Sequence, residues 1–200
     1  MGGYPNPRDC SKCICPRGYG GASCDERPQA KKCGETLTAS SKANTIAYTV
    51  GNILNTEEME DFEECYYWIQ NPGRKTIKMT IKKVEVKFSD MSESSYYISL
   101  ASGCSTGGIE IKAQKDQLLS GYRFCDPDAN EGKTITSSND IVPIIIYNRR
   151  GATEVELEYR TSMQLLLFKL LETSSEWKIF RLIKKRENAF AMLFSNTDEQ

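Results

Sequence analysis

Residues 77–88 read IKMTIKKVEVKF, and the spacing of their apolar side chains predicts a β-strand with an irregularity in the middle. From Ile77 to Ile81 the apolar residues alternate with Thr and Lys, which is the period of a half-buried strand. From Val84 onward the alternation continues on the other parity. Because a slip of one residue would turn the apolar side chains outward, we expect a bulge or bend near Lys82.

The same strand-like texture extends over the chain from residue 33 to residue 160. Isoleucines flank Glu110 within residues 109–111, and apolar residues alternate with glutamates over residues 154–159. Residues 144–147 form a continuous apolar run, which is typical of a strand that is covered on both faces. No convincing helix precedes residue 160. The pattern predicts a mainly β fold, an antiparallel β-sandwich.

The two ends of the chain differ from this central segment. Residues 1–28 are rich in Gly, Pro and Cys and almost free of aliphatic side chains, and residues 29–32 suit a short linker. Residues 161–200 contain Leu, Phe and Lys without Gly, Pro or Cys, and we interpret them as a C-terminal extension, helical or disordered. Its basic cluster would suit an amphipathic surface helix, although we do not expect membrane contact. The interpretation we favour is an extension without a selected function.

Composition restricts the class of protein. Eight cysteines in 200 residues suit an oxidising, extracellular compartment, and a formal net charge of −1 gives no field that favours nucleic acid. Met1 is followed by Gly-Gly-Tyr-Pro and not by an apolar stretch, so no secretory signal is expected at this position. A secreted type of chain without such a signal suggests that further sequence lies upstream.

Four of the cysteines fall in the predicted sandwich. Cys33, Cys65, Cys104 and Cys125 could pair in three ways, of which the simplest is sequential, Cys33 with Cys65 and Cys104 with Cys125. The spacings lack the paired C-x2-C arrangement of a zinc module, so we favour disulfides over a metal site.

The other four cysteines lie in CSKCICPRGYGGASC, residues 10–24. Its pattern C-x-C-x2-G-Y-x-G-x2-C resembles the second half of an EGF-like module, and it is formed by Cys13, Cys15, Gly18, Tyr19, Gly21 and Cys24. The resemblance implies a disulfide between Cys15 and Cys24. It also implies that Cys10 and Cys13 are unpaired here, because their partners would precede Met1. We therefore expect this truncated half-module to fail to fold stably, since it can bury little surface of its own.

A longer stretch narrows the resemblance to one family. GGYPNPRDCSKCICPRGYGGASCDERP, followed by CGETL at Cys33, resembles the segment after the catalytic domain in nematode astacin zinc metalloproteases. CYYWIQNPG from Cys65, GYRFC ending at Cys125 and VPIIIYNRR from Val142 resemble the CUB domain that comes next in those enzymes. The resemblance implies a partial EGF-like module over residues 1–28 and a CUB-like sandwich over residues 33–160, with the sequential pairing of its four cysteines.

The family resemblance also limits the chemistry expected of this chain. Astacin enzymes hold zinc with H-E-x-x-H-x-x-G-x-x-H, and the present sequence contains no histidine. We therefore expect no catalytic residues here, and zinc would belong to a catalytic domain of the parent protein. Many CUB domains bind calcium through loop carboxylates, but YNRRGATE places arginines where an acid would be wanted. Asp90 and Glu93 remain possible oxygen donors, and calcium is not expected.

The predicted function is that of a non-catalytic EGF–CUB portion of a secreted astacin-like zinc metalloendopeptidase, serving protein or substrate interaction. The alternative is a stand-alone extracellular EGF–CUB protein that acts in binding or adhesion. Arg149 and Arg150, at a predicted loop tip, are the candidate contacts for extracellular proteins or protein substrates. Trp68 is expected in the core.

Overall fold

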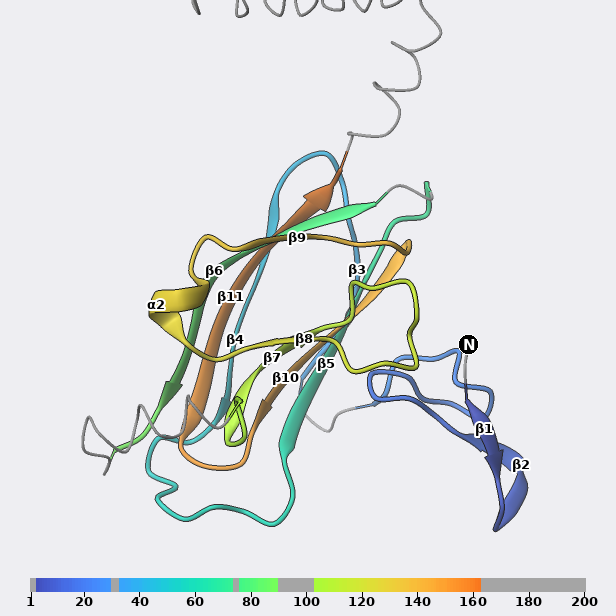
Figure 1. Cartoon of the computed structure of the whole chain (residues 1–200), viewed down its shortest axis with the longest axis horizontal. Helices are drawn as coiled ribbons and strands as arrows, with labels where there is room; N and C mark the ends of the chain where they lie inside the picture. The colour runs from blue at the N-terminus through green and yellow to red at the C-terminus, as the bar shows by residue number, and fades with distance from the viewer. Residues whose placement is uncertain (1–2, 30–32, 74–75, 90–102, 163–200) are drawn as a thin grey trace, which may run out of the picture. The chain divides into compact units, whose positions relative to one another are not determined.

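The computed structural model describes residues 3–29, 33–73, 76–89 and 103–162 (Figure 1). Residues 1–162 form one compact unit, and the C-terminal extension from residue 163 lies outside the described residues. Within the described part the elements are β1 (Tyr4–Asn6), β2 (Asp9–Ile14), β3 (Thr36–Thr38), β4 (Asn44–Gly51), β5 (Glu63–Gln70), β6 (Ile77–Lys87), β7 (Gly107–Ile111), β8 (Tyr122–Phe124), the one-turn helix α2 (Pro127–Asn130), β9 (Thr134–Thr136), β10 (Ile141–Asn148) and β11 (Ala152–Thr161).

Two sheets form the sandwich. The four-stranded sheet has the order β4-β11-β6-β9, and the five-stranded sheet has the order β3-β5-β10-β7-β8. Every strand pair is antiparallel except β3 with β5. The core between the sheets consists of alternate inward residues such as Ile109, Ile144 and Leu157, all fully buried. The predicted mainly β, antiparallel fold is confirmed.

The predicted irregularity lies in β6. Its partner β11 changes register between Glu156 and Leu157, which face Lys83 and Ile81. Lys82 is therefore the extra residue, and its side chain is exposed while the apolar neighbours on both sides of it stay in the core. A bulge of this kind keeps both apolar series of β6 facing inward.

Strand β10 is buried on both faces, as its continuous apolar run predicts. Ile144 and Ile146 point into the core between the sheets. Ile145 and Tyr147 point to the opposite, outer face of the five-stranded sheet and are also buried. Because Ile145 and Tyr147 point away from the four-stranded sheet, a part of the chain outside these two sheets must cover this outer face.

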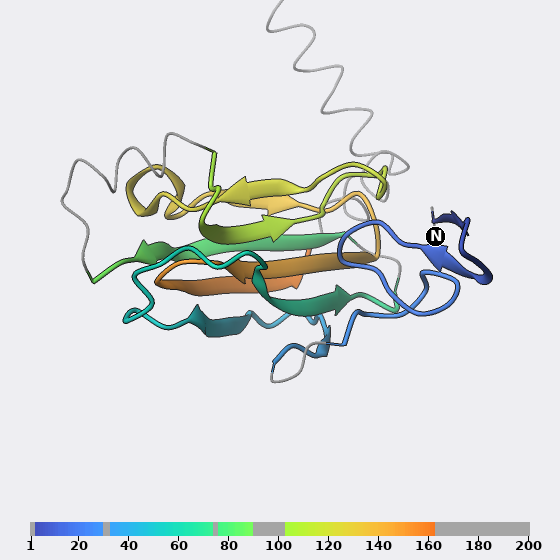
Figure 2. The ribbon, with the colours of Figure 1, turned by 90° about the horizontal axis from the view of Figure 1, so that it is seen from below.

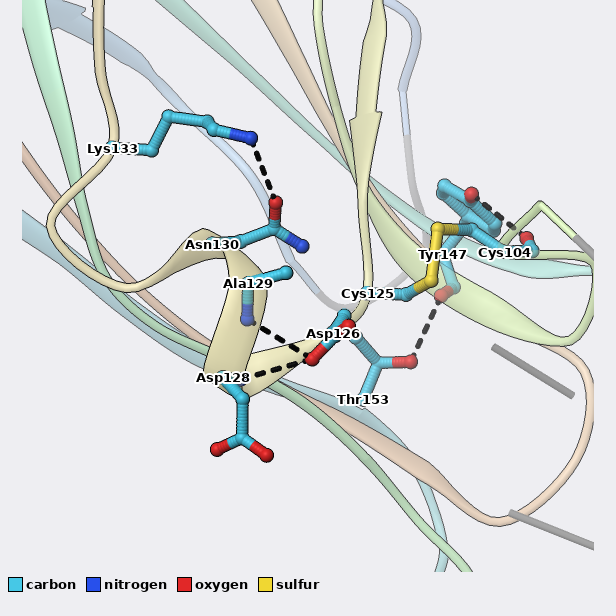
Figure 3. Close-up of a disulfide and its surroundings, with 9 residues drawn as sticks. All are labelled: Cys104, Cys125, Asp126, Asp128, Ala129, Asn130, Lys133, Tyr147 and Thr153. Atoms are coloured by element: carbon cyan, nitrogen blue, oxygen red, sulfur yellow. Dashed lines mark hydrogen bonds between the residues drawn. A yellow bond between two sulfur atoms is a disulfide. The ribbon is translucent and has the colours of Figure 1, made fainter. Parts of the chain in front are cut away.

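One disulfide closes the rim of the sandwich beside β7 and β8 (Figure 3). Cys104 and Cys125 are bonded, and the Tyr147 hydroxyl donates a hydrogen bond to the Cys104 carbonyl at 3.0 Å. Thr153 in turn donates to the Tyr147 carbonyl at 3.1 Å. The side chain of Asp126 caps the short helix α2 that follows. These contacts tie the cysteine loop to β10 and β11.

Candidate interaction site

The segment from residue 15 to residue 28 covers part of the outer face of the five-stranded sheet, and the β1–β2 hairpin lies beside the sandwich in both views (Figures 1 and 2). Because side chains alternate along a strand, the residues between the core positions point to this face. They are Glu64, Tyr66 and Trp68 of β5, Gly108 and Glu110 of β7, Lys112 just after β7, and Pro143, Ile145 and Tyr147 of β10.

The Arg17 side chain makes the ionic contacts of this interface. Its guanidinium donates to the Glu64 carboxylate and, at 2.8 Å, to Glu110. The same group lies over the Tyr147 ring, 4.7 Å from its centroid. Burial alone would lower the pKa of Arg17, but Glu64 and Glu110 outweigh it and the pKa is raised. Arg17 is therefore a fixed cation that joins the N-terminal segment to β5, β7 and β10.

Glu110 is the buried acid that receives Arg17. Its side chain is 1% exposed, and besides Arg17 it accepts hydrogen bonds from Arg123 at 3.0 Å and from the Gly121 amide at 2.8 Å. A buried carboxylate is tolerated when its lone pairs are satisfied in this way. The alternation of residues 109–111 predicts the outward direction of Glu110, but no signal in that pattern reveals that the outer face is covered.

Gly18 allows the backbone to approach the sheet closely. It has a φ of +87°, and a Cβ at this position would lie 2.9 Å from the Pro143 Cβ and 3.3 Å from the Ile145 Cδ1. The Gly18 carbonyl accepts a hydrogen bond of 2.8 Å from the Trp68 indole. The glycine of the GYGG motif therefore serves the contact with the sandwich as well as the local turn.

Tyr19 packs beside Gly18 and extends the interface. Its ring meets Trp68 edge to face with centroids 5.4 Å apart, and its hydroxyl donates to Gln117 at 2.9 Å. Burial raises the pKa of Tyr19 to about 12. Lys112, also buried, donates to the carbonyls of Arg17 at 2.9 Å and Gln117 at 2.7 Å, and burial lowers its pKa.

The expectation that residues 1–28 fail to form stable structure is wrong for this structure. Residues 3–29 are described throughout, with a bridge between Gly20 and Glu26 and a backbone hydrogen bond from Cys13 to Ala22. The expectation counted only surface that the segment could bury within itself. The outer face of the sandwich supplies the missing apolar surface, and Trp68 is buried there by Tyr19 and Cys24 rather than inside the sandwich.

Six cysteines are joined in the structure as Cys15–Cys24, Cys33–Cys65 and Cys104–Cys125. These are the pairs that the sequence and the family resemblance predict, with Cα atoms 5.3–5.5 Å apart.

Cys10 and Cys13 are free thiols on β2, the first exposed and the second partly buried. Since they are three residues apart in a strand, their side chains leave on opposite faces and cannot reach each other.

The predicted contact residues Arg149 and Arg150 are engaged within the chain. Arg149 forms an ion pair with Glu58 and lies over the Phe62 ring, and Arg150 lies over Phe88. Their role as partner contacts stays a prediction. The possible calcium ligands Asp90 and Glu93 fall outside the described residues, and in the described part no three acidic, cysteine or histidine side chains form a metal-binding group.

The sequence of this chain is similar to those of nematode zinc metalloproteinases. Zinc metalloproteinase nas-31 of Caenorhabditis elegans is 38% identical over 159 residues, and nas-32 of the same worm is 34% identical over 161 residues; each alignment covers 80% of this chain. The chain is a homologue of the nematode astacin zinc metalloproteinases. It spans only 23% of the length of either relative. No protein-family model matches the chain.

Solved structures of the EGF–CUB type are more distant from this astacin homologue. The CUB1-EGF-CUB2 domains of rat MASP-1 are 19% identical, with a TM-score of 0.42 over 75% of this chain and 48% of that one. The CUB1-EGF-CUB2 domain of human MASP-1/3 is also 19% identical, with a TM-score of 0.39 over 76% of this chain and 50% of that one. In the described residues of the astacin homologue, no helix has the length and apolar character needed to cross a membrane.

Proposed function

We propose that this chain is the non-catalytic EGF–CUB portion of a secreted astacin-type zinc metalloendopeptidase, where it binds proteins or positions protein substrates. The observation that carries the proposal is the homology to zinc metalloproteinases together with the fraction of them that the chain spans, 23% for the first two relatives. This supports an accessory part of such an enzyme rather than a whole one.

The composition supports a role without chemistry of its own. Astacin-type hydrolysis needs three imidazoles around zinc to activate a water molecule, and this sequence contains no histidine. In this proposal the zinc belongs to a catalytic domain elsewhere in the parent protein. The sandwich and the docked N-terminal segment then contribute surface and position, in an extracellular setting where their disulfides persist.

The docked N-terminal segment supports a positioning role. Arg17, Gly18 and Tyr19 hold the segment on the sandwich through ionic, backbone and aromatic contacts. An accessory domain that is joined to a catalytic domain through a fixed segment presents its surface at a defined orientation, which lowers the entropic cost of holding a substrate.

The test uses the product of the complete gene. We expect removal of residues 33–162 to lower kcat/KM for a folded protein substrate while leaving the cleavage of a short fluorogenic peptide unchanged. The chain on its own should cleave neither substrate when zinc is added. Equal loss on both substrates would mean that the sandwich supports folding of the enzyme rather than substrate interaction. Chelator-sensitive cleavage by the purified chain alone would refute the non-catalytic role.

The same gene also tests the alternative of a stand-alone binding protein. An upstream open frame that encodes HExxHxxGxxH and two further cysteines would support the protease portion. A signal peptide directly before residue 1 would overturn it.

A further inference from the structure

The sandwich is open along one side, where the two sheets end together. Strand β4 is the edge of the four-stranded sheet, and β11 is its one partner among the described strands. In the other sheet β3 pairs only with Trp68–Gln70 of β5. The first part of β5 has no strand partner on that side, where the Cys33–Cys65 disulfide and a hydrogen bond from Arg27 to the Tyr66 carbonyl attach the preceding segment.

A groove lies between these two edges. It has a volume of about 770 Å³. Strand β4 contributes Tyr48 to its wall, the start of β5 contributes Glu63, Glu64 and Tyr66, and Gln29 and Cys33 of the preceding segment also line it. The consecutive residues 48–52 all line it, which means that the backbone edge of β4 faces the groove and not one face of the strand alone.

The edge of β4 offers backbone hydrogen-bonding groups. In an antiparallel pair, alternate residues direct their N–H and C=O groups away from the partner strand. No described residue supplies a backbone hydrogen bond to β4 on the side away from β11. Such an edge is a template for the addition of one more strand.

The charge around the groove selects the kind of strand. Residues 57–64 read EEMEDFEE, which we name the acidic segment. Two of its six acids are neutralised within the chain, Glu58 by Arg149 and Glu64 by Arg17. The other four are exposed and form no ion pair with any described residue: Glu57, Glu60, Asp61 and Glu63. Glu63 lines the groove, and the other three precede it on the connection from β4.

Apolar side chains accompany this charge. Phe62 is 39% exposed within the acidic segment, and Ile53 and Leu54 are exposed on the same β4–β5 connection. Tyr48 and Tyr66 line the groove itself. A partner strand with cations on one face and apolar or aromatic side chains on the other would match both features.

We propose that this groove binds an extended, cationic segment of a partner protein, which adds to the edge of β4 while its lysines or arginines face the acidic segment. The proposal rests on the interaction role proposed above and gives it a site and a class of partner. Such an interaction needs no calcium, since carboxylates contact the cations directly.

The probe is a fluorescein-labelled peptide, KVKYKVKYK, and the assay is fluorescence anisotropy with the full oxidised chain. We expect saturable binding that weakens when salt rises from about 50 mM to about 500 mM. The acidic analogue EVEYEVEYE should not bind. A peptide N-methylated at alternate residues should bind about tenfold more weakly, because it cannot pair fully with β4.

Two sets of substitutions separate the groove from general charge. The test variant combines Glu60→Gln, Asp61→Asn and Glu63→Gln, and it should bind the basic peptide about tenfold more weakly. The control variant removes the same three charges from exposed positions elsewhere, by Asp128→Asn, Glu131→Gln and Glu156→Gln. It should bind as the unmodified chain does. Thermal unfolding of both variants reports whether the fold is retained.

Several outcomes would overturn the proposal. Equal weakening in the two variants would mean attraction by net charge alone, and equal binding of the N-methylated peptide would exclude strand addition. A dimer of the chain at the assay concentration, detected by sedimentation, that is broken by the test variant would assign the groove to a second copy. If the peptide does not bind but the parent enzyme still needs the sandwich to cleave protein substrates, the groove proposal is rejected and the proposed function is kept. If the peptide binds but removal of the sandwich does not affect cleavage, the proposed function is rejected and the groove is kept as a peptide-binding site.

Discussion

Replacement of Arg17 by alanine should release the N-terminal segment from the sandwich while the sandwich stays folded. Arg17 joins Glu64 and Glu110 to a segment that has almost no aliphatic side chains of its own. Without the guanidinium, Glu110 keeps Arg123 and the Gly121 amide as partners, and Glu64 keeps the Tyr66 hydroxyl. The acids therefore lose part of their compensation and the segment loses its ionic contact.

The magnitude follows from burial. Breaking a buried ion pair by removing one partner costs about 3–5 kcal/mol. Arg17 is 29% exposed and Glu110 retains two donors, so solvent screening and the remaining hydrogen bonds reduce the loss. Contact of Arg17 with the Tyr147 ring adds about 0.5–1 kcal/mol. We expect the docking equilibrium to weaken by about 1–3 kcal/mol. When the segment undocks, water can solvate Glu110, so the substitution can cost no more than the free energy of docking.

Tryptophan fluorescence and hydrogen exchange measure this release. Trp68 is 7% exposed because Tyr19 covers it, so undocking should shift its emission to the red. The only other tryptophan, Trp177, is replaced by phenylalanine in all samples. The amides of Gly20 and Glu26, which bond to each other's carbonyls, should lose protection, while β10 amides should keep it.

The matched control is Arg8→Ala, which removes the same charge from an exposed position of the same segment. Gly18→Ala is a second test variant, since it should undock the segment by steric conflict with Pro143 without changing charge. Arg17→Ala with unchanged Trp68 emission and unchanged protection at Gly20 would refute the role of the ionic contact. Equal effects of the Arg8 and Arg17 substitutions would attribute the change to net charge.

Three further outcomes are expected. Cys65→Ser should lower the free energy of unfolding by about 2–5 kcal/mol, measured by urea denaturation, because it opens the loop closed with Cys33; a change below about 1 kcal/mol would contradict this. Cys10 and Cys13 should both be alkylated in the oxidised chain, since they leave β2 on opposite faces, and a Cys10–Cys13 disulfide found by peptide mapping would contradict that geometry. Burial raises the pKa of Tyr19 to about 12 from an ordinary 10, so the docked state keeps a proton that the undocked state loses, and docking should weaken as the pH rises above about 10. In ultraviolet titration the Tyr19→Phe variant should lack the tyrosine transition near pH 12, and a titration unchanged near pH 12 would be evidence against burial of Tyr19.

The sequence predicts the sandwich well because its information is local. The alternation in residues 77–88 identifies β6 and places its bulge at Lys82, and the run at residues 144–147 indicates a strand buried on both faces. The disulfide pairs follow from the family resemblance. The short strands β3, β8 and β9, with three residues each, carry too few alternating positions to be found this way.

The docking site depends on contacts between residues far apart in the chain, and no local pattern contains them. Arg17 and Glu110 are separated by 93 residues, and Gly18 and Trp68 by 50. One indirect signal was available: a strand with two buried faces in a two-sheet fold requires a cover, and the N-terminal segment is a candidate. The groove beside β4 cannot be predicted from the sequence either, because an acidic run such as residues 57–64 is also typical of an ordinary solvent-exposed loop.

The interface explains how half of a disulfide module can be ordered at all. A Gly-rich segment loses much conformational entropy on folding, and Cys15–Cys24 restrains only a short loop of it. The remaining stabilisation comes from a face that the sandwich already presents: Trp68 and Tyr147 as aromatic surface, and Glu64 and Glu110 as acids in place. Since those groups are carried by β5, β7 and β10 of the sandwich, the entropy lost on docking is mainly that of the segment. The free thiols of β2 lie on a segment that Arg17, Gly18 and Tyr19 anchor to the sandwich. A disulfide from Cys10 or Cys13 to another polypeptide would therefore attach that polypeptide to the sandwich through this segment.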